Sequence, residues 1–408
     1  MALDEMILAK NSRYSLNSYD TKLNNNVLVV GASGAGKTRG VVIPNIMQKT
    51  GSYIISDPKG SLYNKYKAEL EEAGYEVKKL DFVNPEDSDH YNFFNYIHST
   101  QDIVKIAHML IYQEESSARH MDPFWDQAAQ LLVQSIIAYL VEHKYAKCTL
   151  RELCNLITLC SMDEAAMDDR MNSLKRRNKE SYAFDTYCKF KAAADKTKAS
   201  ILITVNAKIG LYDIPELNSL TSTDDIDIPS IGQKKTAVFV VISDTDRSLD
   251  PLANLFFTQA MNELVTYADR HCEDNRLPVP VRFILDDFAT NCKIDEFPRM
   301  IASIRSRGIS TMLLIQAESQ LKESYQDDSL TIIANCDTYM YMGSNDIDTA
   351  ESIAKRLDIP MKKVLSMPVG TCHIFRRGEA PYTDEIIDLE AFEKEQKRRN
   401  MAVEQIAV

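Results

Sequence analysis

The chain has 408 residues, more than one hydrophobic core usually serves, so two domains are expected. Its apolar content of 45% and charged content of 26% are those of a globular protein and exclude a disordered or fibrous one. The formal net charge of −12 excludes a uniformly basic protein that coats DNA, but leaves open a pore with a basic lining.

The eight cysteines and seven histidines are scattered, and no two cysteines have the Cys-x-x-Cys spacing of zinc or thioredoxin chemistry. We therefore expect reduced thiols in a cytoplasmic protein and no metal centre built from histidines. The longest apolar stretch, residues 131–141, is too short to span a bilayer, and no signal peptide precedes the first predicted strand.

The first hundred residues alternate predicted strands and helices. The predicted strands cover Val27–Val30, Tyr53–Ser56 and Tyr75–Phe82, and the predicted helices cover Lys37–Gln48 and Leu62–Ala73. This alternation is typical of an α/β protein with a parallel sheet.

The segment GASGAGKT occupies residues 31–38, between the first predicted strand and the first predicted helix. That strand–loop–helix context defines a P-loop, in which backbone N–H groups surround a phosphate. Lys37 would reach the β and γ oxygens, and the Thr38 hydroxyl would ligate Mg²⁺. The residues expected to bind ATP are Gly31, Ala32, Ser33, Gly34, Ala35, Gly36, Lys37, Thr38 and Arg39.

Between residues 100 and 211 the periodicity is helical only, and the apolar stripe of residues 124–141 is expected to be core. This all-α block looks like an insertion into the α/β domain. The expected organisation is therefore 1–99, first part of a nucleotide-binding domain; 100–211, all-α domain; and 212–408, second part of the nucleotide-binding domain with a C-terminal tail.

After residue 212 strand signals return. The predicted strands are Thr236–Ser243, Val281–Leu285, Thr311–Ile315, Thr338–Met342 and Thr371–Phe375. The predicted helices are Leu252–Arg270, Glu296–Arg307 and Thr349–Leu357.

An apolar strand that ends in two acids, Asp286 and Asp287, has the Walker B arrangement. In that arrangement the first acid holds Mg²⁺ and the second orients or activates the attacking water. Alone, such a pair is better explained as a solvated strand end. Downstream of a P-loop in an α/β context, we favour the catalytic interpretation.

Polar residues follow at the distances expected of a motor ATPase. The predicted helix that ends at Arg307 is expected to expose Arg305 and Arg307, and the next strand ends at Gln316. Gln316 would sense the γ-phosphate, and Arg305 would stabilise transition-state charge at the ATP of a neighbouring subunit. For Arg307 a solvated basic face is the preferred interpretation.

Several blocks together carry a family resemblance. These blocks are GASGAGKTRGVVIPN, SYIISDPKGSLY, FWDQAAQLL, LPVPVRFILDDFAT, IASIRSRGIS and IIANCDTYMYMGSNDIDTA. In this order and at these separations, residues 25–380 resemble the type IV coupling proteins of conjugation systems, closest to the TraG-like branch of Gram-positive conjugative elements.

The resemblance implies a RecA-like P-loop NTPase domain interrupted by an all-α domain, assembled as a membrane-anchored homo-hexamer. Such ATPases join relaxase-bound DNA to secretion-channel proteins. Lys37 and Thr38 match the P-loop pair of the family, Asp286 its Mg²⁺-linked acid, Arg305 its trans arginine and Gln316 its sensor. Asp57, Pro58 and Lys59 fall on its DPKG signature, for which the plain interpretation is a strand-to-helix turn with φ fixed by Pro58.

The chain departs from the family pattern at two places. The family usually has glutamate where this chain has Asp287, and the shorter side chain would misplace the water or slow hydrolysis. The N-terminal transmembrane helices of the family are also absent, so membrane association is expected only through partners or a missing N-terminal segment, at the cytoplasmic face.

The preferred function is therefore an ATP-driven coupling ATPase that moves DNA. Its candidate phosphate contacts are two basic clusters, Lys175, Arg176 and Arg177, and Lys191, Lys196 and Lys198. Basic clusters on helices are, however, more often solvated faces. One alternative is a substrate receptor or adaptor for protein cargo that binds ATP and hydrolyses it slowly. A small-molecule kinase is a third, although the sequence displays no acceptor pocket.

Overall fold

The computed structural model describes residues 4–112, 123–143, 147–290 and 292–407, which fall into two compact units. The sheet unit comprises residues 1–79, 228–244 and 260–408, and the helical unit comprises residues 80–227 and 245–259. The division falls within strand β5 (Glu76–Asp81) and helix α12 (Asp250–His271). The all-α segment expected at residues 100–211 falls inside the helical unit.

A nine-stranded sheet, in the order β11-β10-β9-β3-β8-β7-β4-β6-β5, organises the sheet unit. Besides β5, its strands are β3 (Val27–Val30), β4 (Ser52–Ser56), β6 (Thr236–Val241), β7 (Val281–Leu285), β8 (Ile309–Ile315), β9 (Thr338–Tyr341), β10 (Thr371–Arg376) and β11 (Tyr382–Glu385). Strands β9, β3, β8, β7, β4 and β6 pair in parallel, whereas β10 is antiparallel to β9 and β11. The predicted α/β class with a parallel sheet is confirmed.

The central strands are continuous apolar runs because helices cover both faces of a parallel sheet. All residues of β3, β6 and β7 are buried. Outside this sheet, β1 (Glu5–Ile7) and β2 (Arg13–Ser15) form an antiparallel hairpin that the sequence did not predict.

Helices connect the strands, and α18 follows the last strand. In the sheet unit they are α1 (Ser18–Thr21), the π-helix η1 (Thr38–Val42), α2 (Ile43–Ile46), α3 (Ser61–Glu72), α11 (Ile228–Ile231), η5 (Glu273–Asn275), α13 (Phe297–Met300), η6 (Ile304–Arg307), α14 (Glu318–Tyr325), η7 (Gln326–Asp328), α15 (Ser329–Ala334), α16 (Ile347–Leu357), α17 (Met361–Leu365) and α18 (Leu389–Ala407). The predicted helix Lys37–Gln48 is thus a π-turn followed by one α-turn.

The predicted helix Glu296–Arg307 is wrong as one element. Glu296 has φ +55° and precedes α13, and a turn at residues 301–303 separates α13 from the 3₁₀-helix η6. Pro298 favours only the first turn of a helix, and Gly308, with φ +78°, ends η6. The predicted exposure of Arg305 and Arg307 is also wrong, because both are only partly exposed.

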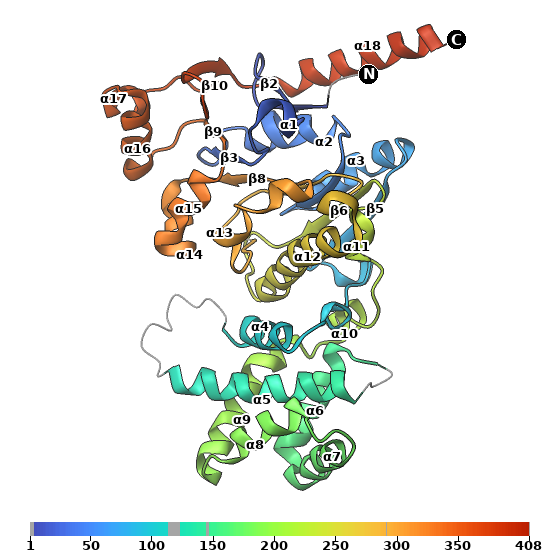
Figure 1. Ribbon diagram of the computed structural model, residues 1–408. Coiled ribbons are helices and arrows are strands. Elements are labelled where there is room, and N and C mark those ends of the chain that lie inside the picture. The colour runs from blue at the N-terminus through green and yellow to red at the C-terminus, as the bar shows by residue number, and fades with distance from the viewer. Residues whose placement is uncertain (1–3, 113–122, 144–146, 291, 408) are drawn as a thin grey trace. The chain divides into compact units, whose positions relative to one another are not determined.

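The helical unit contains η2 (Pro85–Asp87), η3 (Phe93–Tyr96), α4 (Thr100–Ile111), α5 (Pro123–Glu142), α6 (Leu150–Met162), α7 (Glu164–Arg177), α8 (Tyr182–Lys191), α9 (Asp195–Ile209), η4 (Gly210–Tyr212) and α10 (Pro215–Leu220). Helix α5 lies among α4, α6, α8 and α9 (Figure 1). Every residue from Leu132 to Leu140 is buried, so this helix is enclosed rather than buried on one stripe. Phe124, expected in the core, is instead 46% exposed.

Within the described residues, no helix combines the length and apolarity that a bilayer crossing requires.

Candidate nucleotide-binding site

The P-loop lies at the carboxyl edge of the parallel sheet, between β3 and η1. The N–H of Gly31 donates to Ile315 O at 3.1 Å and that of Ala32 to Gly343 O at 2.8 Å, which fixes the loop between β8 and β9. Gly34 and Gly36 have φ of +79° and +88°, values that favour glycine. The first amide groups of the following helix have no intrahelical acceptor, so this end of the loop can bind an anion.

Lys37 is 8% exposed and points back into the loop. Its Nζ donates to Gly31 O at 2.7 Å and to Ala32 O at 3.3 Å. Burial lowers the pKa of the Lys37 ammonium group, and the carboxylates of Asp286 and Asp287 partly offset this. The ammonium group therefore lies at the base of the loop, opposite two acids.

Thr38 and Asp286 meet directly. The Thr38 hydroxyl donates to Asp286 Oδ2 at 2.5 Å, although the residues are 248 positions apart. Asp286 is 7% exposed, and burial raises the pKa of its carboxyl group; Asp287 adds to the rise, whereas Thr38 and Lys37 oppose it. The Ser56 hydroxyl on β4 donates to Asp286 O at 2.9 Å and fixes the backbone.

Asp287 and Gln316 form the second pair. Gln316 Nε2 donates to Asp287 Oδ1 at 3.4 Å, and Gln316 N donates to Gln320 Oε1 at 2.9 Å. Asp287 has φ +52°, and the Thr290 hydroxyl donates to its carbonyl oxygen at 2.8 Å. The turn after β7 thus directs the two acids differently, Asp286 toward Thr38 and Asp287 toward Gln316.

The donor set fits Mg²⁺ held together with nucleotide phosphates. Magnesium usually binds through one or two carboxylates plus substrate phosphates rather than in a cage of protein ligands. The adjacent oxygens of Thr38 and Asp286 supply that kind of site. In the described part of the chain, no cluster of three or more His, Cys, Asp or Glu side chains could hold a metal by itself.

A cavity of about 270 Å³ adjoins the tip of the P-loop. Residues 32–35, 342–345, 364–365 and 367–370 line it. Sequence reasoning missed it, although β9 is parallel to β3 and so brings residues 342–345 to the P-loop edge. The cavity offers space for the part of a nucleotide beyond its phosphates.

The C-terminal segment after β11 packs on the helix that follows the P-loop. A Cβ atom on Gly40 would lie 2.7 Å from Ile386 Cγ2, and one on Gly36 would lie 3.9 Å from it. Glycine at position 40 therefore permits this close approach. The sequence contained the signal, an otherwise unfavourable glycine inside a predicted helix, but it did not identify the partner.

The DPKG block has a structural role. Asp57 is buried, and its Oδ2 accepts the N–H groups of Leu62 at 2.8 Å and Tyr63 at 2.9 Å, at the start of α3. Burial raises the pKa of Asp57, and these backbone hydrogen bonds oppose the rise. The turn from β4 to α3 is thus held by the Asp57 carboxylate.

Two predicted site residues lie apart from this cluster. Arg39 is exposed on η1. Arg305 precedes β8 at the amino edge of the sheet, opposite the P-loop, where its Nη2 donates to Ser18 O at 2.7 Å. The structure therefore brings together Lys37, Thr38, Asp286, Asp287 and Gln316, but does not place Arg305 near the P-loop of its own chain.

The chain is similar to known proteins over most of its length. Residues 4–358 match the family model described as type IV secretory system conjugative DNA transfer. VirD4 of Rhizobium rhizogenes is 24% identical over 344 residues, 81% of this chain and 49% of VirD4. The TraG conjugal transfer protein of Escherichia coli is 21% identical over 352 residues, 81% of this chain and 54% of TraG. The chain thus spans about half the length of these curated relatives.

Solved structures of the plasmid coupling protein TrwB share the fold. TrwB bound to the non-hydrolysable ATP analogue ADPNP superposes with a TM-score of 0.67, and TrwB bound to ADP and Mg²⁺ with 0.64. Each is 17% identical and covers 89% of this chain and 85% of the TrwB chain. The expected RecA-like α/β fold is therefore shown.

Proposed function

The chain belongs to the type IV secretory system conjugative DNA transfer family, and from that membership we propose that it is an ATP-hydrolysing coupling protein. It would drive a relaxase-bound DNA strand, or another secretion substrate, to a type IV secretion channel. The observation that carries the proposal is the contact of Thr38 with Asp286 at 2.5 Å, beside Lys37 and next to the Asp287–Gln316 pair.

Each residue of the cluster has a distinct task in this proposal. Lys37 neutralises charge on the β and γ phosphates, and Thr38 and Asp286 hold Mg²⁺, which stabilises negative charge on the phosphates when bound. Asp287 accepts a proton from, or orients, the attacking water, and Gln316 responds to the γ-phosphate through its hydrogen bond to Asp287. Enclosure of the two acids strengthens these electrostatic interactions.

The proposed assembly is a homo-hexamer at the cytoplasmic face of the membrane, in contact with DNA, relaxase and channel proteins. Two observations support it. Arg305 is too remote from its own P-loop to act in cis, and the family is described by conjugative DNA transfer.

ATP turnover by the Lys37→Ala and Asp286→Ala variants tests the site. Both variants are expected to lose hydrolysis, because no other residue replaces the ammonium charge or the Mg²⁺ oxygen. Lys355→Ala is the matched control, since Lys355 lies on α16 in an exposed ion pair with Glu351 and should retain wild-type turnover. Wild-type turnover in Lys37→Ala or Asp286→Ala would show that the site is assigned wrongly.

A protein-cargo receptor is the second candidate. The observation that favours it is Asp287, which is shorter than the glutamate expected from the family and already bonded to Gln316. Such a receptor would bind ATP at the same P-loop but hydrolyse it slowly, with or without DNA.

A further inference from the structure

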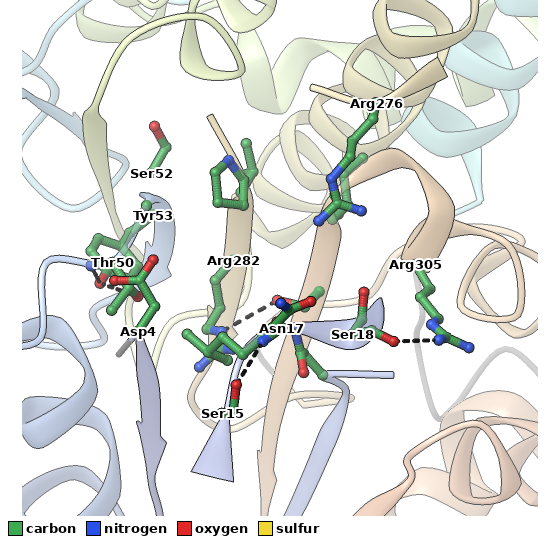
Figure 2. Close-up of a pocket in the computed structure, with 18 residues that line it drawn as sticks. Asp4, Ser15, Asn17, Ser18, Thr50, Ser52, Tyr53, Arg276, Arg282 and Arg305 are labelled. Atoms are coloured by element: carbon green, nitrogen blue, oxygen red, sulfur yellow. Dashed lines mark hydrogen bonds between the residues drawn. The ribbon is translucent and has the colours of Figure 1, made fainter. Parts of the chain in front are cut away.

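A cavity of about 400 Å³ lies at the amino edge of the sheet, where β4, β7 and β8 begin (Figure 2). Its walls come from the β2–α1 segment, the start of β4, the start of β7 and the turn before β8. The P-loop follows the carboxyl end of β3, at the opposite edge. This cavity is therefore separate from the proposed nucleotide site.

Three arginines from three segments line the cavity. Arg282, on β7, is only 6% exposed, and its Nε donates to Ser310 Oγ at 3.3 Å. Arg276 stacks over the Tyr19 ring at 5.3 Å, and Arg305 donates through Nη2 to Ser18 O at 2.7 Å. Figure 2 shows the three side chains around one space.

Their charges are uncompensated. Across the described residues, none of these three guanidinium groups forms an ion pair, and the two Nη atoms of Arg282 have no protein acceptor. Six other arginines among the described residues do form ion pairs: Arg247 with Asp250, Arg299 with Glu296, Arg307 with Asp269, Arg356 with Glu318, Arg376 with Glu379 and Arg377 with Asp337. Arg39 and Arg270 form none either within the described part of the chain, but their side chains are exposed to water, whereas Arg282 is buried. Asp4, the acid that lines the cavity, bonds to none of the three.

A largely buried guanidinium group without a counter-charge is costly, because it loses part of its solvation. Burial lowers the pKa of Arg282 to about 10, so the group stays protonated at neutral pH. An acidic chain, with net charge −12, has many carboxylates available for pairing. The absence of such a pair at three converging arginines points to an external anion.

We propose that this cavity binds a phosphate-type oxyanion, with Arg282 at its base and Arg276 and Arg305 at its sides. Guanidinium groups bind phosphate through paired N–H donors, and the Nη atoms of Arg282 supply such a pair. The cavity volume exceeds that of one phosphate, so the oxyanion can belong to a nucleotide. Its source is either a free phosphate compound or the nucleotide held by a second copy of this chain.

Thermal unfolding in the presence of inorganic phosphate tests the site. The parent protein is Lys37→Ala, which removes the phosphate-binding ammonium group of the P-loop, and chloride at equal ionic strength corrects for salt. Saturating phosphate should raise the Tm of this parent by about 2 °C or more. Adding Arg282→Met should abolish the shift, and adding Arg276→Ala should reduce it. Adding Arg307→Met, which breaks an ion pair in the same region, should leave the shift intact.

Without phosphate, Arg282→Met should raise the Tm, because it removes an uncompensated buried charge. If Arg282 has only a structural role through its hydrogen bond to Ser310, Arg282→Met should instead lower the Tm. If Arg282→Met does not fold, the Arg276→Ala response decides the test alone. The proposal is overturned if phosphate raises the Tm of the folded arginine variants as much as that of the parent. The test is independent of the proposed ATPase function, because the Lys37→Ala parent is already expected to lack ATP hydrolysis.

Sedimentation with ADPNP, in chains that retain Lys37, distinguishes the two sources. If a second copy supplies the phosphate, ADPNP should promote self-association of the wild type but not of Arg282→Met. If the source is free, the two proteins should associate equally while the phosphate shift persists. Stabilisation by a single-stranded oligonucleotide, but by neither phosphate nor pyrophosphate, would overturn the proposal in favour of a DNA-backbone site.

Discussion

The Asp286 carboxyl group is buried, and burial of its ionised form has a cost for folding. Burial, the largest cause, and Asp287 raise the pKa of the Asp286 carboxyl group, while Thr38 and Lys37 oppose the rise. Because the folded-state pKa lies above the unfolded one, this carboxyl group favours the folded state at pH below its unfolded pKa. That contribution is lost as the pH rises through the folded pKa.

Asp286→Asn should therefore raise the Tm at pH 7 by roughly 2 °C, on the scale of 1 kcal/mol, while abolishing hydrolysis. Its amide oxygen can still accept the hydrogen bond from Thr38. Thermal unfolding without nucleotide or Mg²⁺ measures the effect, which should shrink at pH 4 as the wild-type carboxyl group becomes protonated. A lower Tm for Asp286→Asn at pH 7 would contradict this explanation.

Asp287 is the residue that separates a competent ATPase from a slow one. Asp287→Glu should preserve or raise ATP turnover, because it restores the side-chain length that the family resemblance implies. Asp287→Asn should lower turnover at least tenfold, because an amide cannot accept a proton from the attacking water. If steady-state hydrolysis by Asp287→Asn equals that of the wild type, Asp287 is only the solvated end of a strand.

At the scale of elements, the short π-helix η1 follows the P-loop and packs against the C-terminal segment. Gly40 on η1 lies against Ile386, and α18 contacts α2. An ion pair of 2.9 Å joins Glu393 on α18 to Lys65 on α3. π-Turns are rare and often occur at functional sites. The segment after β11 thus supports the helix that begins at Thr38.

Gly40→Ala should destabilise the protein by about 1–3 kcal/mol, because the added Cβ would lie 2.7 Å from Ile386 Cγ2. Ile386→Ala should remove that clash. The double variant should therefore lose less stability than the sum of the losses in the two single variants. A double-mutant cycle in urea measures the coupling. Additive effects would show that the two elements do not constrain each other.

The sequence predicts most of these elements, and the exceptions have physical causes. Strands β3 and β7 match their predicted ranges because continuous apolar runs flanked by turn residues are unambiguous. The predicted helix 296–307 was wrong because the region contains two short elements, α13 and η6. Apolar periodicity alone does not distinguish two such short helices from one longer helix. The hairpin β1–β2 is held by distant partners, such as Asn45 and Asp384, and long-range contacts leave no local pattern.

In the candidate site too, local sequence patterns were predictable and long-range contacts were less so. The P-loop and the acids after β7 were predictable because their chemistry fixes residue types and spacing. The contact of Thr38 with Asp286 follows from β3 and β7 ending at one edge of a parallel sheet. The cavity lined by Arg276, Arg282 and Arg305 was not predictable, because the spacing of isolated arginines in the sequence does not show that their side chains meet in the fold.

At the scale of the whole molecule, Arg305 lies at the sheet edge opposite its own P-loop. If it is catalytic, it acts on the nucleotide of a neighbouring subunit. Turnover per chain should then rise with protein concentration, and Arg305→Ala alone should lose on the order of 10³-fold in rate.

Mixing tests this arrangement. Arg305→Ala and Lys37→Ala proteins combined should recover part of the turnover, because mixed assemblies contain some intact composite sites. Arg305→Ala mixed with Asp286→Ala should behave in the same way, whereas Lys37→Ala with Asp286→Ala should not, since both lesions lie in one site. No recovery at any mixing ratio would contradict a trans role for Arg305.

Contacts with DNA must be local on a chain with net charge −12. On the helical unit, Lys191 and Lys198 already pair with Glu164 at 2.6 and 2.9 Å, which reduces their value as phosphate contacts. Lys175 pairs with Asp185, whereas Arg176 and Arg177 are exposed at the end of α7. These two arginines are the candidates that remain from the predicted basic cluster of residues 175–177.

ATP turnover with and without single-stranded DNA, across a salt series, tests the proposed DNA-coupling function most directly. We expect DNA to stimulate hydrolysis severalfold at low salt, and the stimulation to fade as salt rises because phosphate contacts release counterions. Arg176→Glu with Arg177→Glu should weaken both the stimulation and its salt dependence while basal turnover remains. If DNA does not stimulate a confirmed assembly even at low salt, the coupling motor is contradicted and the protein-cargo receptor takes its place.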